Sequence, residues 1–234
     1  MRALLLACVA TTAAALATQT CIEVTLKIAM DCNGAVDDLG DKAERFTSPA
    51  SLDAVHRLRR HCDAVLVGAS TVIRDDPSLI VRRVPLAPRT AQPLRVVLGR
   101  APADAGLLND GAADTVVFSK DGEGDARLGG SGAAALPGVL RALERRGVRH
   151  LMVEGGPRTA LYFLAAGLVD RAIVVRAPVA FADDPVPSGI TAETLRSAGL
   201  AFDSRRDVGG DDTHVWTRSG LPPLWGMLLE EEPA

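Results

Sequence analysis

The chain has 234 residues, of which 47% are hydrophobic, 24% charged and 3% aromatic, and its formal net charge is −3. This is the composition of a globular domain that is long enough to bury a core. Nucleic-acid binding proteins usually carry excess positive charge or aromatic stacking surfaces, and this chain lacks both. Small molecules are therefore the expected ligands.

The first seventeen residues (MRALLLACVATTAAALA) contain one arginine, an apolar stretch and many small side chains. This pattern resembles a targeting segment, and the alternative is a first helix packed on the domain. The apolar part is too short and too rich in Ala and Thr to favour a membrane span. We predict a possible targeting segment over residues 1–20, compatible with the cytoplasm or with an organelle such as a plastid.

The four cysteines and four histidines are scattered along the chain, without a C-x-x-C pair or a closely spaced histidine pair. Structural zinc sites and disulfide-rich scaffolds need tighter spacing or a higher density of these residues. We therefore predict free thiols and no metal site.

Strand and helix patterns alternate through most of the chain. Apolar or β-branched runs predict strands at residues 21–30, 63–68, 94–98, 115–119, 150–153 and 170–176. Helical periodicity predicts helices that begin at Pro49, Leu136 and Arg158. Residues 200–206 and 213–218 read as a closing hairpin, residues 120–133 as a surface loop and residues 221–234 as a loose tail.

This order of elements predicts an α/β fold, with a mostly parallel central sheet flanked by helices and an antiparallel C-terminal hairpin. No internal repeat and no convincing linker interrupts the pattern. We predict one domain over residues 21–219, followed by a C-terminal tail over residues 220–234.

The strongest local signal is the segment 151–168, LMVEGGPRTALYFLAAGL. A buried strand ends at Val153, Gly155 and Gly156 form a turn, and Pro157 occupies the first position of a helix. Free amides and the helix dipole make such a position suitable for a phosphate, which can approach a glycine backbone closely. Because many α/β proteins use two glycines only to turn, the pattern alone leaves a phosphate site and a plain turn as equal alternatives.

A second signal is the segment 67–82, VGASTVIRDDPSLIVR. Its hydroxyl and carboxylate side chains, including Ser70, Thr71 and Asp75, could hold a ribose or an amide after a buried strand. The alternative is a solvated turn, which is the usual structure of D-D-P-S and is favoured by the pattern alone. Similarly, Arg59 lies in a run of arginines that is either a solvated helix face or a phosphate-binding group.

Taken together, these segments resemble the reductase domain of riboflavin biosynthesis. That domain is the carboxyl-terminal half of a bifunctional deaminase–reductase and has a dihydrofolate-reductase-like fold. The similarity runs from about Val24 to Arg218 and rests on V-G-x-x-T-V-x-x-D-D-P-x-L and V-E-G-G-P-x-x-x-x-x-x-L-x-A-G-L-V-D. No zinc signature of the deaminase half is present, so a stand-alone reductase is expected.

The resemblance implies NADPH-dependent reduction of a 5-amino-6-(5-phosphoribosylamino)uracil-type substrate to its ribitylamino product, by a homodimer. The cofactor contacts that it implies are Ala29, Thr71, Asp75, Gly155, Gly156, Pro157, Arg158, Thr159, Ala160, Leu161 and Tyr162. The substrate contacts that it implies are Arg59, Leu79, Arg82 and Glu154. Glu154 and Asn33 are the candidate catalytic residues, and the alternative for Glu154 is a carboxylate that only fixes its own turn.

The chain also departs from the family pattern. Asn33 replaces a usual aspartate and cannot transfer a proton as a carboxylic acid can. Ala43, Arg45 and Arg100 stand where other residues are common. Two alternatives therefore stay open: a pterin or dihydrofolate reductase, which should need a carboxylate on the first helix near Asp53, and a catalytically decayed NADPH-binding module.

Overall fold

The computed structural model describes residues 20–38, 40, 46–86, 91–120, 126–127, 132–182, 184–221 and 224–229. The predicted targeting segment, Ala43, Arg45 and most of the predicted surface loop lie outside the described residues.

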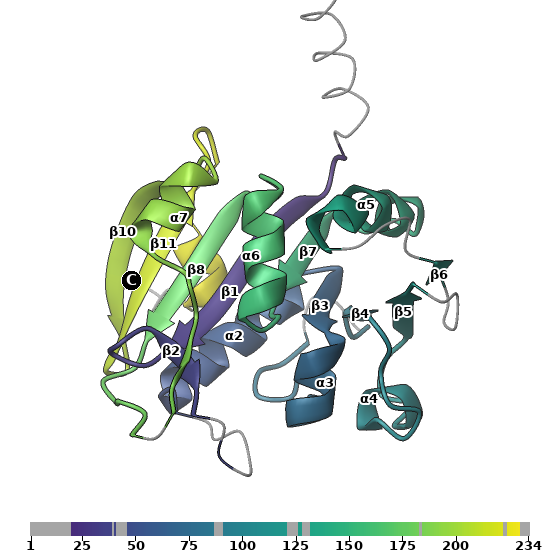
Figure 1. Cartoon of the computed structure of the whole chain (residues 1–234), viewed down its shortest axis with the longest axis horizontal. Helices are drawn as coiled ribbons and strands as arrows, with labels where there is room; N and C mark the ends of the chain where they lie inside the picture. Colours follow the sequence, from purple (N-terminus) through teal and green to yellow (C-terminus); the bar gives the residue numbers. More distant parts are fainter. Residues whose placement is uncertain are drawn as a thin grey trace, which may run out of the picture.

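A twisted sheet crosses the whole domain (Figure 1). Its strands, in spatial order, are β10 (Ala201–Val208), β11 (Asp211–Thr217), β8 (Arg171–Arg176), β1 (Glu23–Met30), β7 (His150–Val153), β3 (Ala64–Gly68), β4 (Leu94–Leu98), β5 (Thr115–Ser119) and β6 (Ala126–Arg127). The strands from β8 to β6 are parallel, and β11 and β10 run antiparallel at one edge. The predicted sheet and its closing hairpin are thus confirmed.

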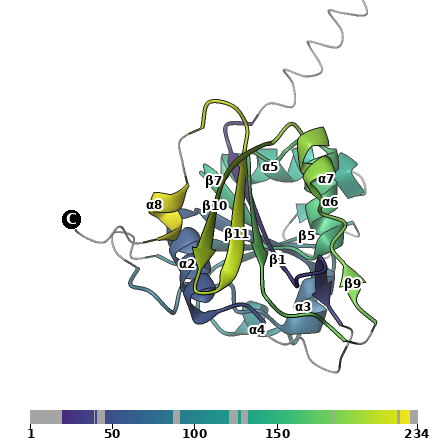
Figure 2. The same cartoon turned by 90° about the vertical axis from the view of Figure 1, so that its left-hand side faces the viewer.

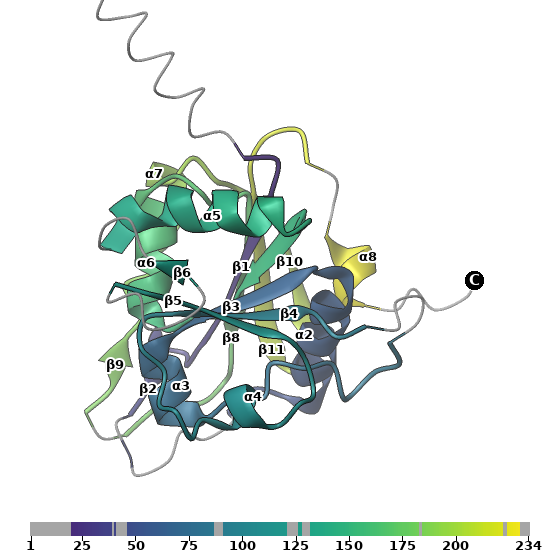
Figure 3. The same cartoon turned by 90° about the vertical axis from the view of Figure 1, so that its right-hand side faces the viewer.

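Helices cover both faces of this sheet. They are α2 (Pro49–His61), α3 (Ala69–Asp75), α4 (Gly106–Asn109), η1 (Gly132–Ala135), α5 (Leu136–Arg145), α6 (Pro157–Ala165), α7 (Ala192–Ser197) and α8 (Trp225–Leu228). The views in Figures 2 and 3 place α5, α6 and α7 on one face, and α2 and α8 on the other. This three-layer arrangement explains why the inner strands are almost entirely apolar, since both of their faces are buried.

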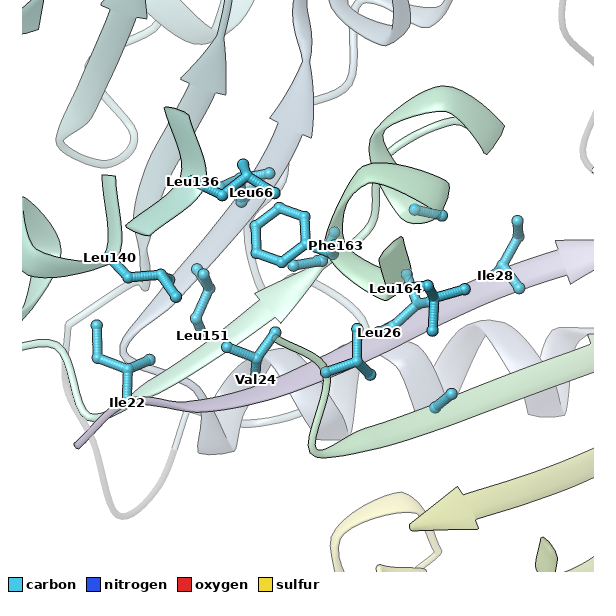
Figure 4. Packing of buried hydrophobic residues seen from close by; sticks show 14 of the residues in the cluster. Ile22, Val24, Leu26, Ile28, Leu66, Leu136, Leu140, Leu151, Phe163 and Leu164 are labelled. Carbon is cyan, nitrogen blue, oxygen red and sulfur yellow. The ribbon is translucent and has the colours of Figure 1, made fainter. Parts of the chain in front are cut away.

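The core on the α5–α6–α7 side is built from aliphatic side chains and few rings. Phe163 of α6 is fully buried and lies close to Leu66 of β3 and Leu151 of β7, while Leu164 lies above Leu26 of β1 (Figure 4). This packing fixes α6 against β1, β7 and β3. The position of the Gly155–Gly156 turn is therefore set by a rigid core.

Helix α2 is anchored at its first residue. The Ser48 hydroxyl caps the helix by accepting a hydrogen bond from the Ser51 amide at 3.1 Å. The same serine donates its hydroxyl to the Val208 carbonyl at 2.9 Å and its amide to the Asp211 carboxylate at 2.8 Å. The antiparallel edge of the sheet therefore sets where α2 begins.

Three features differ from the sequence prediction. The polar segment after β3 is partly helical, because α3 continues directly from the strand and ends at Asp76 in a left-handed conformation. A separate two-stranded sheet joins β2 (Ala35–Asp37) to β9 (Val186–Pro187). The expected loose tail was wrong for residues 224–229, because Leu224, Trp225 and Leu228 are buried against the α2 face.

Candidate active site

Two adjoining clefts open where β1, β7 and β3 end. The α2 cleft, of about 470 Å³, lies between α2, the end of α3 and the segment 76–82. The β2 cleft, of about 420 Å³, lies between α3, the small β2–β9 sheet and the start of α6. Both are lined by Lys27, Ala29, Phe46, Thr71, Asp75 and Glu154. The carboxyl edge of a parallel sheet is where α/β proteins usually bind ligands.

A carboxylate and a guanidinium form the centre of the α2 cleft. Glu154 follows β7, and its two carboxylate oxygens accept from Arg59 Nε at 2.5 Å and from Arg59 Nη2 at 2.7 Å. Burial alone would raise the pKa of Glu154, but Arg59 and Lys27 together bring it below its usual value. Glu154 is therefore ionised at neutral pH and acts as a hydrogen-bond acceptor.

Lys27 of β1 lines both clefts, and it is not among the predicted site residues. Burial is the main reason that its pKa is lowered, with Glu154 opposing the shift and Arg59 adding to it. The sequence did hold a signal, because Lys27 interrupts an otherwise apolar stretch of a central strand. A charge at such a position is costly unless it faces a partner or a solvent-filled site.

His56 of α2 also lines the α2 cleft and was not predicted. Its side chain is 4% exposed, and its Nδ1 accepts a hydrogen bond from the Arg82 amide at 3.1 Å. Burial, followed by the charges of Arg59 and Arg82, lowers the pKa of His56 to about 4. The imidazole is therefore neutral at physiological pH and fixes the backbone of the segment that bears Arg82.

The turn between α3 and Arg82 holds an unusual backbone conformation. Asp76 and Leu79 have φ values of 37° and 52°, in the left-handed region that side chains disfavour. Such conformations cost on the order of 1–3 kcal/mol each and gather at functional sites. Asp76 is fixed by accepting from the Gly106 amide at 2.8 Å, and Leu79 is buried in the wall of the cleft.

The start of α6 leaves its first turn without a side-chain cap. Gly156 is the N-cap residue, its amide donates to Thr71 Oγ1 at 3.2 Å, and no side chain caps the helix. A Cβ on Gly156 would meet only Thr71 Oγ1 at 3.5 Å, whereas a Cβ on Gly155 would lie 2.6 Å from Thr159 Cβ. Gly155 is therefore required by packing, and Gly156 leaves space beside an anion-binding helix terminus.

A third cavity, the β4 pocket, lies across the start of α6 from the β2 cleft. It has a volume of about 380 Å³ and is lined by residues that follow β3, β4 and β5 and by the first turns of α6. Three cations, Arg100, Lys120 and Arg158, contribute to its lining. Arg158 is held there by donating to Ser70 Oγ at 2.8 Å.

The opposite edge of the β2 cleft is closed by an ion pair between α3 and β2. Arg74 donates to both carboxylate oxygens of Asp37 at 3.0 Å. Burial, followed by the Asp37 carboxylate, raises the pKa of the adjacent Asp75. The pair connects the small β2–β9 sheet to the helix that carries Thr71.

The family model of the RibD C-terminal domain matches residues 23–206 of the chain. The chain belongs to this family. The resemblance identified from the sequence motifs is thereby confirmed.

Curated relatives agree with this assignment. The chain is 39% identical over 166 residues to the riboflavin biosynthesis protein RibD of Aquifex aeolicus, covering 66% of this chain and 46% of that protein. It is 34% identical over 169 residues to the 2,5-diamino-6-ribosylamino-4(3H)-pyrimidinone 5′-phosphate reductase of Methanothermobacter thermautotrophicus. This match covers 67% of this chain and 77% of that protein. The chain thus spans less than half the length of the Aquifex RibD protein and most of the length of the archaeal reductase.

Solved structures confirm the dihydrofolate-reductase-like fold. RibD of Acinetobacter baumannii, form 2, matches with a TM-score of 0.67 and 24% identity over 84% of this chain and 57% of that chain. Dihydrofolate reductase from Enterococcus faecalis, complexed with NADP(H) and RAB-propyl, matches with a TM-score of 0.53 and 13% identity over 84% and 96%.

Within this RibD-type domain, most of the predicted site residues come together around α6. Ala29, Thr71, Asp75, Gly155, Gly156 and Pro157 line the β2 cleft, and Arg158, Thr159 and Tyr162 line the β4 pocket. Arg59, Leu79, Arg82 and Glu154 line the α2 cleft.

Three predicted residues lie elsewhere. Ala160 is buried in the core, and Leu161 packs beside Gly189. Asn33 lies in an exposed turn, where its amide donates to Asp31 Oδ1 at 2.9 Å, and it lines none of the three cavities. The neighbouring Asp31 is fully buried and organises the turn by also accepting from the amides of Ala35 and Phe181.

Across the described residues, no group of three or more His, Cys, Asp and Glu side chains is arranged to hold a metal ion. No helix of the described ranges has both the length and the apolar character needed to cross a membrane.

Proposed function

We propose that the chain is an NADPH-dependent reductase that converts a 5-amino-6-(5-phosphoribosylamino)uracil-type substrate to its ribitylamino product. The observation that carries this proposal is that Lys27 and the Arg59–Glu154 ion pair line the same cleft, beside the uncapped start of α6. Membership of the RibD C-terminal family and the name of the archaeal relative support the same class of substrate.

The protein offers a fitting site for a phosphorylated dinucleotide. The cofactor pyrophosphate would lie at the first turn of α6, where Gly156 leaves space and no side chain caps the helix. The adenosine end would occupy the β4 pocket, where Arg100, Lys120 and Arg158 suit the additional phosphate of NADPH. When bound, this cofactor supplies the hydride.

Lys27 is proposed to provide the proton that opens the sugar. Reduction of a ribosylamine at C1′ requires that the bond from C1′ to the ring oxygen break, which leaves an imine as the electrophile. The departing oxygen needs a proton, and a partly buried ammonium with a lowered pKa gives up its proton more readily than an exposed lysine does. Lys27 lies at the junction of the two clefts, within reach of ligands in either.

Glu154 and Arg59 are proposed to orient the substrate. Because the pKa of Glu154 is lowered, its carboxylate suits acceptance of hydrogen bonds from sugar hydroxyls better than donation of a proton. Arg59 donates its Nε and Nη2 hydrogens to Glu154, and its Nη1 donates to the Ile80 carbonyl at 3.1 Å. The proposed phosphate contact therefore passes mainly to Arg82, an exposed arginine in the lining of the α2 cleft.

The two alternatives receive less support. A pterin site would need a carboxylate from the first helix, but Asp53 of α2 pairs with Arg83 at 2.6 Å and does not line the α2 cleft. The hypothesis of a decayed module depended partly on Asn33, which lies in an exposed turn away from the cleft.

We also propose a homodimer, as the family resemblance implies. Sedimentation at the mass of a monomer would contradict it.

The direct test mixes the purified protein with NADPH and the phosphoribosylamino-pyrimidine, in its deaminated and its diamino forms, and follows cofactor absorbance. We expect oxidation with at least one form and much weaker activity with NADH. Turnover of dihydrofolate instead would favour the pterin alternative. Tight NADPH binding with no turnover of any of these substrates would indicate the decayed module.

A further inference from the structure

A small cavity lies behind Lys27, between the sheet, α2 and α8. Its volume of about 10 Å³ is close to the space that one water molecule needs. Its walls are mostly aliphatic and aromatic, and they include Lys27, Leu58, Thr213, Trp225 and Leu228. Lys27 thus borders this cavity on one side and the two ligand clefts on the other.

Helix α8 forms the outer wall of the cavity. Figures 2 and 3 both place it beside α2, and the two helices are in contact. Trp225 is 6% exposed and Leu228 is 4% exposed, although they belong to a helix of only four residues near the C-terminal end of the described chain. The short helix therefore lies as a cover over the α2 side of the core.

This cover is fastened to the antiparallel edge of the sheet. Trp225 Nε1 donates to Ser204 Oγ of β10 at 2.8 Å, and the Arg206 guanidinium lies 4.7 Å from the centre of the Trp225 ring. The family model ends at residue 206, so α8 lies outside the matched segment.

We propose that α8 seals the rear of the active site and blocks the entry of bulk water to Lys27 from that side, which makes Trp225 and Leu228 positioning residues for that lysine. An apolar wall behind an ammonium disfavours its protonated form, and for Lys27 this desolvation outweighs the opposing charges of Glu154 and Asp211. The lowered pKa of Lys27 agrees with this arrangement. The sealing role itself stands independently of the proposed reaction, and only its kinetic consequence rests on it.

The test measures the ionisation of Lys27 in the free protein by competitive labelling with acetic anhydride across a pH series, with peptide mass spectrometry as the readout. The midpoint of the labelling curve reports ionisation, whereas its plateau reports access. In Trp225→Ala we expect the midpoint to move to higher pH, so that labelling at neutral pH, relative to the plateau, falls by about threefold to tenfold. Trp225→Phe, which keeps an aromatic wall, should stay near the native midpoint.

The chain offers a matched control in its second tryptophan. Trp216 is 5% exposed and belongs to the cluster on the opposite, α5–α6–α7 side, where the Arg196 guanidinium lies 5.6 Å from its ring. Trp216→Ala should leave the Lys27 midpoint unchanged. Leu228→Ala, a smaller opening of the same wall, should raise the midpoint and serves if Trp225→Ala does not fold. An unchanged midpoint in a folded Trp225 or Leu228 variant overturns the proposal.

The kinetic readout separates this proposal from the proposed function. If the protein reduces the substrate, the apparent pKa of Lys27 in the pH profile of kcat/KM should rise in Trp225→Ala. It should stay unchanged in Trp216→Ala. A native protein without turnover, but with the expected labelling shift, would contradict the proposed function and support the seal. Turnover by the native protein, with no shift of the labelling midpoint or of the pH profile in Trp225→Ala, would support the proposed function and contradict the seal.

Discussion

The two carboxylate oxygens of Glu154 are each bound by a different nitrogen of Arg59, at 2.5 Å and 2.7 Å, and both side chains are 11% exposed. The pair joins the residue after β7 to the last turn of α2. Because Glu154 is held in a fixed orientation and kept ionised, it presents a preorganised acceptor to a ligand in the α2 cleft.

Removal of Arg59 should therefore damage stability as well as substrate binding. Arg59→Ala leaves the Glu154 carboxylate buried beside only Lys27, and we expect a loss of about 2–4 kcal/mol in the free energy of unfolding. Chemical denaturation provides the measurement.

The matched control is a more exposed ion pair, between Asp53 of the same helix and Arg83. Arg83 and Asp53 are each 33% exposed, so Arg83→Ala should change the free energy of unfolding by less than about 1 kcal/mol. Equal losses in Arg59→Ala and Arg83→Ala would mean that the Arg59–Glu154 pair has no special structural role.

Lys27 should matter for the rate and much less for cofactor binding. Under the proposed function, Lys27→Met removes the proton donor while keeping an aliphatic stem of similar length, and kcat should fall by about 10²–10⁴-fold. The affinity for NADPH, measured by fluorescence titration, should stay within about threefold, since the uncapped start of α6 and the cations of the β4 pocket are proposed to hold its phosphates. A variant with nearly native kcat would remove Lys27 from the reaction.

The two glycines before α6 should respond differently to an added methyl group. Gly155→Ala places a Cβ 2.6 Å from Thr159 and should lower the melting temperature. Gly156→Ala has a φ of −62° and open space, so the fold should tolerate it, while NADPH affinity falls about tenfold as the methyl group meets the pyrophosphate. Native NADPH affinity in Gly156→Ala would place the cofactor elsewhere.

Because the pKa of His56 is lowered in the folded chain, the protein should lose stability at acidic pH. Its pKa is about 4 in the folded chain, against an ordinary value of 6.5, so between these values the unfolded chain binds more protons. The free energy of unfolding should therefore fall as the pH is lowered from about 6.5 to 4, by about 1–2 kcal/mol after screening by solvent in the cleft.

His56→Asn tests this directly, because the Asn amide oxygen can accept from the Arg82 amide but does not titrate in this range. The variant should show a flatter dependence of stability on pH than the native chain between these limits. An unchanged slope would assign the loss of stability at acidic pH to other groups.

The sequence allowed the parallel sheet and hairpin to be predicted, because strands buried on both faces leave short apolar runs that local patterns detect. The elements that it missed depend on tertiary contacts. Helix α3 has seven residues and a single buried position, β2 and β9 pair across 150 residues of chain, and α8 owes its burial to β10 and α2. Such short segments carry too little periodicity to predict alone.

The site was predictable to a similar extent. The family motifs named Glu154, Thr71 and Arg82 as contacts, and these side chains line one cleft. The motifs did not identify Lys27, because it lies within a predicted buried strand. They also did not show that Arg59 binds Glu154. These are relationships between side chains from different elements, which only the folded chain defines.

The central claim is that the cofactor bound at α6 delivers hydride to the opened sugar above Lys27 and Glu154. Incubation of the protein with NADPH deuterated at the transferable position, together with the phosphoribosylamino-pyrimidine, tests it by mass spectrometry of the product. We predict a ribitylamino product with a single deuterium at C1′, formed by the native chain and nearly abolished in Lys27→Met. A reduced product without deuterium, or NADPH bound with the substrate unchanged, would contradict the claim.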